Sequence, residues 1–343
     1  MSGPATAEIL PTHTPALFAS AVERAAALLA SGEVVALPTE TVYGLAANAL
    51  DPVAVGKIYA TKGRPSRNPI IVHVADLAMA RSCVREWPEL AGRLAAAFWP
   101  GPLTLVLPRS SRIPDIVTGG GDTVGIRWPS HPFMLAVMRR TGLPLAAPSA
   151  NPSNQISPTN AEHVARHLGG KLRLIVDGGQ CQVGVESTVV DLTSVPPRIL
   201  RPGMVTAEDL KPFGIVDGLP PRSTDADAIS LKSPGQLARH YSPKARMILT
   251  RWKTVAELER LIIETGVAPD RVHVIVVHVV PVQIADPARI VVVPDDPEAY
   301  ARALYAALHR CDDLGAEAIL VEMPPEAPGW QAVRDRLTRA AAK

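Results

Sequence analysis

Apolar residues in the first 200 positions fall into short runs that predict both helices and strands. Residues 16–31 carry Ala, Leu and Val at helical spacing before Gly32, which predicts a helix that ends there. Apolar runs bounded by Pro or Gly predict strands at 34–37, 70–74, 103–107, 124–127, 172–176, 187–192 and 198–200, and residues 131–140 and 159–168 have helical patterns. Because helices and strands do not alternate strictly, we expect an open, twisted mixed sheet with flanking helices.

The pattern becomes regular after residue 243. Strands are predicted at 247–249, 272–278, 290–293 and 318–322, and helices at 255–264, 298–310 and 330–341. This alternation predicts a smaller Rossmann-like α/β/α domain, although neither glycine-rich nucleotide motif of such domains is present. A segment rich in Gly, Pro, Ser and Asp separates the two parts. We therefore predict one domain at 1–212, a linker or lid at 213–243 and a second domain at 244–343.

Composition narrows the class of protein. Hydrophobic residues make up 47% of the 343 residues and charged residues 20%, which is enough for two folded cores. The net charge of +2 argues neither for nor against nucleic-acid binding, and any basic surface would have to be a local patch. The cysteines at 83, 181 and 311 are too far apart in sequence to predict a disulfide framework or a zinc site. No secretory signal or membrane-spanning run is apparent, so we expect a cytoplasmic protein.

Two polar islands adjoin predicted strands. PTETVYG, residues 38–44, directly follows a strand, and the ends of strands are where ligand sites gather in α/β sheets. KGRPSRNP, residues 62–69, places Lys62 and Arg64 two residues apart, so in an extended segment both would point to the same side and suit a polyphosphate. A capped turn and a solvated basic loop are the competing interpretations.

Further islands are rich in neutral donors and glycine. The loop APSANPSNQISPT, residues 147–159, gathers serine and asparagine side chains that suit a polar ligand, or alternatively cap the next helix. GGGDTVGIRWPSHP, residues 119–132, and DGGQCQVGVESTVVD, residues 177–191, combine glycines that permit close approach with Arg127 and Ser187 at strand ends.

Taken in order, these strings closely resemble the YrdC family, the threonylcarbamoyl-AMP synthases. The matching strings are PTETVYGLAANA, IYATKGRPSRNPIIVH, FWPGPLTLVL, VGIRWPSHP, PLAAPSAN, SPTNAEHV, VDGG, GVESTVVDL and ILRPG, which span roughly residues 20–210. The family's KxR and SxN signatures are present as Lys62-Gly63-Arg64 and Ser149-Ala150-Asn151. SPGQLARHYSPK and the second domain resemble the long, two-domain form of the family.

The resemblance implies a role for each matching position. It implies that Lys62 and Arg64 are the catalytic charges, that L-threonine is surrounded by Thr41, His73, Arg127, Ala147 and Ser187, and that ATP is held by Arg64, Asn68, Thr123, Ser149, Asn151, Ser157, Arg201, His240 and Tyr241. The guanidinium of Arg127 suits the threonine carboxylate because it can bind two oxygens at once.

The resemblance also implies the reaction. Threonine captures bicarbonate as a carbamate, the carbamate attacks the α-phosphorus of ATP, and pyrophosphate leaves. Mg²⁺ is expected to arrive with ATP and to have no direct protein ligand. The product is expected to pass to the threonylcarbamoyl-transfer enzyme that acts on tRNA. The sequence identifies no general base.

Two other classes of protein, and a different role for the second domain, are the alternatives to this function. A nucleic-acid-binding module of the same fold, with weak RNA binding, should be richer in Lys, Arg and aromatic residues than these islands, and aromatics are only 4% of the chain. A carbamoyl-transfer domain of a hydrogenase-maturation protein should carry zinc-finger-like and acylphosphatase-like segments, which are absent from the sequence. Residues 244–343 are also compatible with a metabolite sensor or a docking module.

Overall fold

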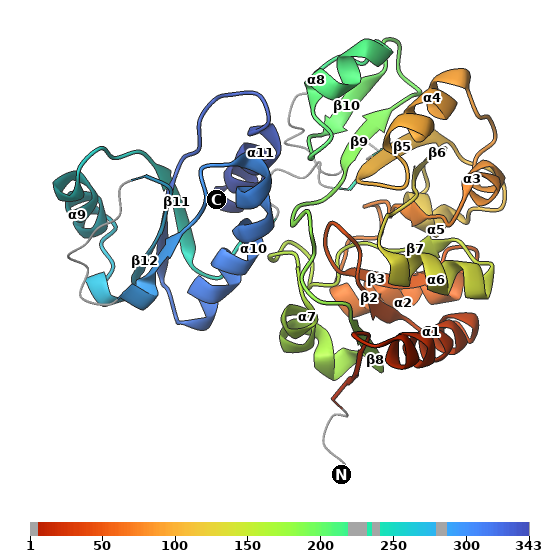
Figure 1. Cartoon of the computed structure of the whole chain (residues 1–343), viewed down its shortest axis with the longest axis horizontal. Helices are drawn as coiled ribbons and strands as arrows, with labels where there is room; N and C mark the ends of the chain where they lie inside the picture. Colours follow the sequence, from red (N-terminus) through yellow and green to blue (C-terminus); the bar gives the residue numbers. More distant parts are fainter. Residues whose placement is uncertain (1–5, 219–231, 235–240, 279–286, 343) are drawn as a thin grey trace. The chain divides into compact units, whose positions relative to one another are not determined.

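Two compact units make up the chain, each with its own sheet. The computed structural model describes residues 6–218, 232–234, 241–278 and 287–342 (Figure 1). The larger unit comprises Met1–Ser153 with Ser157–Leu237, and the smaller unit comprises Asn154–Ile156 with Ala238–Lys343. The division at 237/238 lies inside the predicted linker. The short segment 154–156 belongs to the smaller unit, where the amide of Ser242 donates to the main-chain oxygen of Asn154 at 2.9 Å.

The sheet of the larger unit is mixed, as the sequence predicted. The described strands follow the order β1-β8-β2-β3-β7-β4-β6-β5-β9-β10 and pair in both parallel and antiparallel fashion. Their bounds are β1 (Glu8–Pro11), β2 (Val35–Leu37), β3 (Gly44–Asn48), β4 (Val72–His73), β5 (Leu103–Pro108), β6 (Thr123–Arg127), β7 (Leu145–Ala146), β8 (Leu174–Asp177), β9 (Thr188–Asp191) and β10 (Arg198–Arg201).

Helices bury both faces of this sheet. Because side chains alternate along a strand, Val35 and Leu37 of β2 pack into one apolar cluster and Ala36 packs into the other. The first cluster includes α1 (Pro15–Ala30) and α6 (Pro132–Thr141), and the second includes α2 (Pro52–Lys62), α4 (Glu89–Phe98) and α7 (Ala161–Leu168). The shorter helices are α3 (Leu77–Cys83), α5 (Asp115–Thr118) and α8 (Ala207–Leu210).

The ends of α2 place the basic island. Asp51 caps the start of this helix by accepting from the amides of Val53 and Ala54. The helix ends at Gly63, whose φ of +62° lies in the left-handed region that favours glycine. Lys62 is therefore the last helical residue, and Arg64 starts the loop that leads into β4. The KxR spacing thus bridges a helix end and a loop, whereas the sequence predicted a uniformly extended segment.

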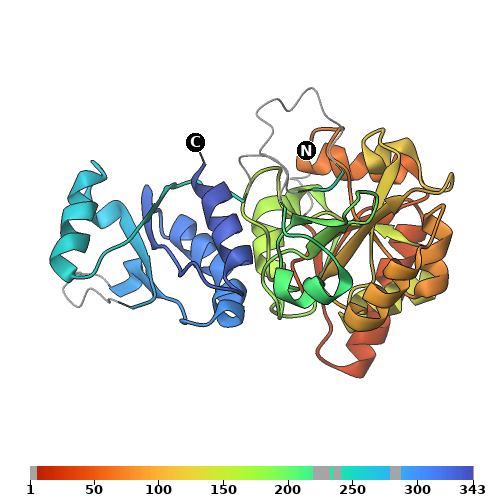
Figure 2. The same cartoon turned by 90° about the horizontal axis from the view of Figure 1, so that it is seen from above.

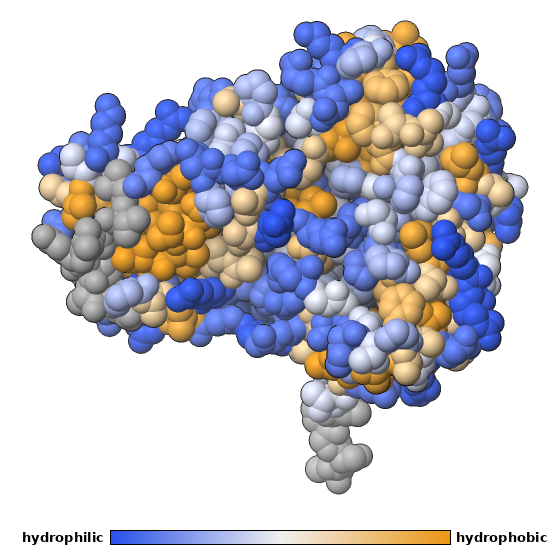
Figure 3. Space-filling model, in the orientation of Figure 1, coloured by the Kyte–Doolittle hydropathy of each residue, from blue (hydrophilic) through white to orange (hydrophobic). Residues whose placement is uncertain are grey.

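The smaller unit has an all-parallel sheet in the order β11-β14-β12-β13, as expected for a Rossmann-like domain. The strands are β11 (Arg246–Thr250), β12 (Val272–Val276), β13 (Ile290–Val292) and β14 (Ala318–Glu322). α9 (Val255–Glu264) lies on one face, and α10 (Pro297–Asp313) and α11 (Gln331–Ala341) pack together on the other (Figure 2). Apolar side chains also reach the surface of this unit (Figure 3), and Ile263 and Val292 are among those exposed.

No membrane-spanning helix occurs among the described residues, because none of their helices is both long and apolar enough to cross a bilayer.

Candidate active site

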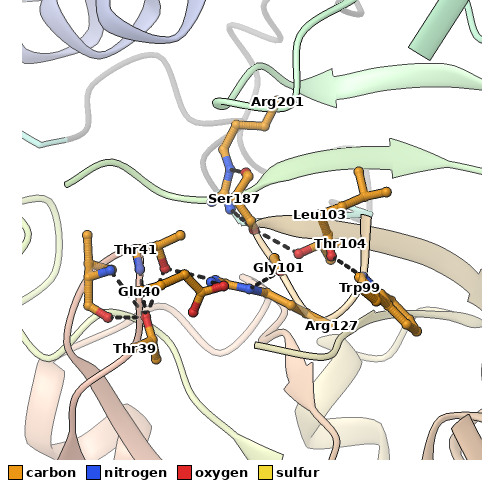
Figure 4. Close-up of polar contacts among 11 residues, drawn as sticks. Thr39, Glu40, Thr41, Trp99, Gly101, Leu103, Thr104, Arg127, Ser187 and Arg201 are labelled. Atoms are coloured by element: carbon orange, nitrogen blue, oxygen red, sulfur yellow. Dashed lines mark hydrogen bonds and ion pairs between the residues drawn. The ribbon is translucent and has the colours of Figure 1, made fainter. Parts of the chain in front are cut away.

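A buried guanidinium joins the loop after β2 to the end of β6. Arg127 Nη1 donates to Thr41 Oγ1 at 2.9 Å, its Nε donates to the main-chain oxygen of Gly101 at 3.3 Å, and its Nη2 lies 2.7 Å from Glu40 Oε1 (Figure 4). Arg127 is 4% exposed and Glu40 3% exposed. Buried charges persist where they are paired, so these two side chains hold each other in place.

The loop that carries Glu40 is itself tightly hydrogen-bonded. Thr39 Oγ1 donates to the main-chain oxygen of Val42 at 2.6 Å and lies 2.9 Å from Thr41 Oγ1. The amide of Tyr43 donates to Pro158, and the amide of Ala150 donates to Tyr43. These contacts fix the two threonines and the glutamate against the serine-rich loop, so PTETVYG is a rigid platform.

A second polar group is built from β5, β9 and β10. Ser187, just before β9, places its Oγ 2.8 Å from Thr104 Oγ1 of β5. Arg201 at the end of β10 donates from Nη2 to Ser187 Oγ at 3.1 Å (Figure 4). All three side chains are buried. Five separate chain segments therefore bring hydroxyls, one carboxylate and two guanidinium groups into one polar region of an otherwise apolar core.

His73 stands beside Arg127 in the sheet. Strands β4 and β6 are parallel, and His73 pairs in register with Arg127. Burial, followed by the charge of Arg127, lowers the pKa of His73 to about 3, so the ring is neutral near pH 7. Its Nδ1 has no hydrogen-bond partner among the described residues. A neutral ring with an unused nitrogen suits hydrogen bonding to a polar ligand rather than charge pairing.

Lys62 links the KxR and SxN signatures. Its Nζ donates to the main-chain oxygens of Ser149 and Asn151, and its own main-chain oxygen accepts from the amide of Ser153. Burial, followed by the charge of Arg64, holds the pKa of Lys62 well below its ordinary value. An arriving polyphosphate would favour the charged form, because opposite charge raises the pKa of an amine.

The basic loop is ordered around Arg64 and Asn68. Arg64 donates from Nε to the main-chain oxygen of Asn68 at 3.1 Å and from Nη2 to that of Pro69 at 2.7 Å. Asn68 is 2% exposed, and neither its Nδ2 nor its Oδ1 has a partner among the described residues. A buried amide without partners is costly, and a ligand would satisfy it.

The glycine-rich island packs against the same loop. Gly119 has a φ of +62°, and a Cβ there would lie 2.6 Å from the main-chain oxygen of Arg67, so a larger residue would push the two loops apart. Thr123 starts β6 and Arg127 ends it, at opposite ends of the strand. The length of β6 thus separates Thr123 from Arg127, so the two side chains do not lie side by side.

Sequence comparison identifies the family. Residues 27–203 match a family model described as "Telomere recombination", which spans Sua5, YciO and YrdC proteins. Residues 205–342 match a model described as the C-terminal domain of threonylcarbamoyl-AMP synthase. This chain belongs to the YrdC-type threonylcarbamoyl-AMP synthase family. The resemblance drawn from the sequence motifs is therefore confirmed in both domains.

Full-length relatives share this architecture. The threonylcarbamoyl-AMP synthase of Pyrococcus abyssi (strain GE5 / Orsay) is 42% identical over 320 residues, which cover 92% of this chain and 93% of the relative. The enzyme of that name from Bacillus subtilis (strain 168) is 42% identical over 326 residues, covering 93% and 92%. A crystal structure of P. abyssi Sua5 complexed with L-threonine has a TM-score of 0.88 at 38% identity and covers 98% of each chain.

The other positions to which the family resemblance gives a substrate-binding role lie in the serine-rich loop and in the linker. Ala147 is buried, and its Cβ lies 3.2 Å from where a Cβ on Gly44 would stand. Ser157 donates to Glu186 Oε1 at 2.6 Å. Tyr241 is buried within the smaller unit, with its ring centroid 5.8 Å from that of Tyr305. His240 lies outside the described residues, so the nucleotide-binding roles of both linker residues stay predictions.

The site also contains polar residues that the sequence analysis did not select. Glu40 was visible between two threonines, Thr104 interrupts the apolar strand LTLVL, and Glu186 precedes Ser187. A buried polar residue inside an apolar run was the available signal. Their significance depends on contacts with Arg127, Ser187 and Ser157, which are distant in sequence.

Proposed function

We propose that this protein is an L-threonylcarbamoyladenylate synthase, which condenses L-threonine, bicarbonate and ATP to threonylcarbamoyl-AMP and pyrophosphate. The observation that carries the proposal is the pairing of two kinds of site in one unit. Hydroxyls and a guanidinium gather at Thr41, Arg127 and Ser187, and buried cations lie at Lys62 and Arg64. The family membership and the threonine complex of the P. abyssi relative support the same reading.

In this proposal the first group binds threonine. Arg127 holds the carboxylate through its guanidinium, while Thr41, Ser187 and the neutral ring of His73 supply hydrogen bonds. Ala147, which is buried, would contact the threonine side chain. Positioning of the amino acid lowers the barrier by holding its reacting nitrogen where bicarbonate arrives.

The second group binds ATP. Lys62, Arg64 and Arg201 offset the charge that develops as the carbamate attacks and pyrophosphate leaves. Asn68, Thr123, Ser149, Asn151 and Ser157 provide neutral contacts to the nucleotide. The chemistry needs no covalent nucleophile, because the carbamate oxygen attacks the α-phosphorus directly.

Mg²⁺ would enter with the nucleotide. Among the described residues, no three His, Cys, Asp or Glu side chains gather as a metal cluster. The groups proposed around the phosphates are cationic or neutral, so phosphate oxygens and water are the ligands that the metal would use. When bound, the ion would neutralise part of the polyphosphate charge.

The proposal extends to the linker and to partners. Ser233 is buried on the larger unit, Lys232 Nζ lies 3.0 Å from Asp191 Oδ2, and the main-chain oxygen of Pro234 accepts from Arg201 Nη1 at 3.4 Å. These contacts support a linker that closes over the nucleotide side and shields the labile carbamate from water. We place the enzyme in the cytoplasm, where its product passes to the transfer enzyme for tRNA.

Pyrophosphate release tests the proposed function. Purified protein with Mg-ATP should release pyrophosphate only when both L-threonine and bicarbonate are present. Release with ATP alone, or none with the complete mixture, would contradict it. An RNA-binding module would instead retain RNA without consuming ATP, which a filter-binding measurement at two salt concentrations distinguishes.

A further inference from the structure

Glu40 is a buried carboxylate whose bonding capacity is largely unused. It is 3% exposed and lies 2.7 Å from Arg127 Nη2, close enough for an ion pair. Neither of its oxygens has an aligned hydrogen bond among the described residues. A carboxylate has about four lone-pair sites, and leaving them empty in a buried place is costly. The position therefore has room for a donor that belongs to a ligand.

The negative charge of Glu40 beside Arg127 is not explained by carboxylate binding alone. If Arg127 only had to bind a carboxylate, a neighbouring glutamate would weaken it, because both carboxylates would compete for one guanidinium. Glu40 and Arg127 together present one negative and one positive group side by side (Figure 4). An α-amino acid is a zwitterion with the opposite arrangement. The pair is thus complementary to the ammonium and the carboxylate of one ligand.

The neighbouring contacts leave Glu40 the carboxylate best placed for an ammonium. Thr41 Oγ1 accepts from Arg127 Nη1, and the main-chain oxygen of Gly101 accepts from Nε. Ser187 and Thr104 bring hydroxyls only. Glu186, the other buried glutamate of the region, already accepts from Ser157 at 2.6 Å.

We propose that Glu40 binds the α-ammonium of L-threonine and accepts a proton from it. The inference rests on the proposed function and supplies the base that the reaction requires. Glu40 takes one proton from R–NH₃⁺ and becomes a neutral carboxylic acid, which leaves R–NH₂ with a free electron pair. The amine then forms an N–C bond to bicarbonate, water leaves, and the carbamate R–NH–COO⁻ remains. Glu40 afterwards returns its proton to solvent.

A merely structural role for Glu40 makes a different prediction. If the carboxylate only orients Arg127, its loss weakens every ligand that uses Arg127, whether or not the ligand has an ammonium. If Glu40 also touches the ammonium, its loss weakens ligands that carry an ammonium more than ligands that lack one. L-Threonine and its 2-hydroxy analogue, in which a hydroxyl replaces the ammonium, separate the two cases.

The test is calorimetric binding of both ligands to the full chain and to Glu40→Gln. The unmodified protein should prefer threonine by roughly 10- to 100-fold, the usual effect of a hydrogen bond to a charged group. Glu40→Gln should reduce this preference to about threefold or less, whereas equal weakening of both ligands would overturn the proposal. Failure of the unmodified protein to bind threonine would instead reject the proposed function.

Two further measurements make the result independent of one variant. Glu40→Asp keeps a carboxylate on a shorter side chain, so it should keep the preference for threonine even if overall affinity falls.

At saturating substrates, Glu40→Gln should form product about 100-fold more slowly, the usual effect of losing a general base. Its rate should then rise with pH, because free amine becomes more common. A pH profile unchanged from that of the unmodified protein would overturn the proton-accepting role.

Discussion

Arg201 donates twice to Ser187, from Nε to the main-chain oxygen at 3.0 Å and from Nη2 to Oγ at 3.1 Å. This fork joins β10 to the residue that opens β9. It also joins Arg201, a predicted ATP contact, to Ser187, a predicted threonine contact whose Oγ lies 2.8 Å from Thr104 Oγ1 as well. The two proposed substrate sites would therefore share the hydroxyl of Ser187.

Ser187→Ala should raise the KM for threonine about tenfold, because one hydrogen bond to the substrate is lost. Stability should fall by about 1–2 kcal/mol, since Thr104 Oγ1 and Arg201 Nη2 each lose a buried hydrogen-bond partner. Steady-state kinetics and urea unfolding measure the two effects. Ser31→Ala is the control, because Ser31 caps the end of α1 and its hydroxyl donates to the main-chain oxygen of Leu28 at 2.8 Å. Its threonine KM should not change, and an unchanged KM in Ser187→Ala would remove that hydroxyl from the threonine site.

Arg64→Ala should raise the barrier by about 2–4 kcal/mol, because Arg64 is proposed to offset charge in the transition state. Pyrophosphate release at saturating ATP is the measurement. The matched control is Arg166→Ala, which removes a surface ion pair with Glu162 and should leave the rate unchanged. A near-normal rate in Arg64→Ala would place that guanidinium outside the reaction.

The sequence predicted most of the smaller unit and much of the larger one. The helix at 255–264 has the predicted bounds, because Thr254 caps it and its apolar spacing is regular. The strand Gly44–Asn48 was missed, since GLAAN has low strand propensity and pairs with β2 and β7 only through the tertiary fold. Helix α2 was missed although Asp51-Pro52 is a helix-start signal.

The candidate site, like the fold, could be predicted from the sequence only in part. The sequence motifs identified Thr41, Arg127 and Ser187 individually as candidate site residues. They could not show that Glu40 meets Arg127, because the two positions are 87 residues apart and the ion pair exists only once β2 and β6 occupy one sheet. Contacts of this kind depend on packing between residues that are far apart in sequence, which local hydrophobic periodicity does not reveal.

Amino-acid selectivity should depend on the hydroxyl of threonine more than on its methyl group. Serine lacks only the methyl, which is worth about 1–3 kcal/mol, so it should be a poor but measurable substrate. Valine lacks the hydroxyl and should be nearly inert, because the buried groups that pair with the threonine hydroxyl would lose that partner. Competition in the pyrophosphate assay gives the ratios of kcat/KM. Comparable turnover of valine would contradict a site that reads the hydroxyl.

His73 should make the protein lose stability in acid. Its pKa is lowered from 6.5 to about 3 by burial and by Arg127, so the unfolded chain binds a proton that the folded chain does not. The free energy of unfolding should therefore fall as the pH drops below 6.5, by about 2 kcal/mol between about pH 7 and about pH 5.

His73→Asn isolates this contribution. Burial also lowers the pKa values of His131 and His163, so acid loss from those two residues remains in the variant. Urea unfolding at both pH values should show a pH dependence in His73→Asn that is smaller by about 2 kcal/mol. An identical pH dependence in both proteins would show that His73 is not a neutral buried group.

Mass spectrometry of the product shows whether the protein forms threonylcarbamoyl-adenylate from bicarbonate. The protein is incubated with L-threonine, Mg-ATP and either ordinary or ¹³C-labelled bicarbonate, and the mixture is quenched and separated at once. We expect a species with the mass of threonylcarbamoyl-adenylate that becomes heavier by one mass unit with the labelled bicarbonate. ATP consumption that gives only AMP, ADP or an adenylate without the bicarbonate carbon would contradict it.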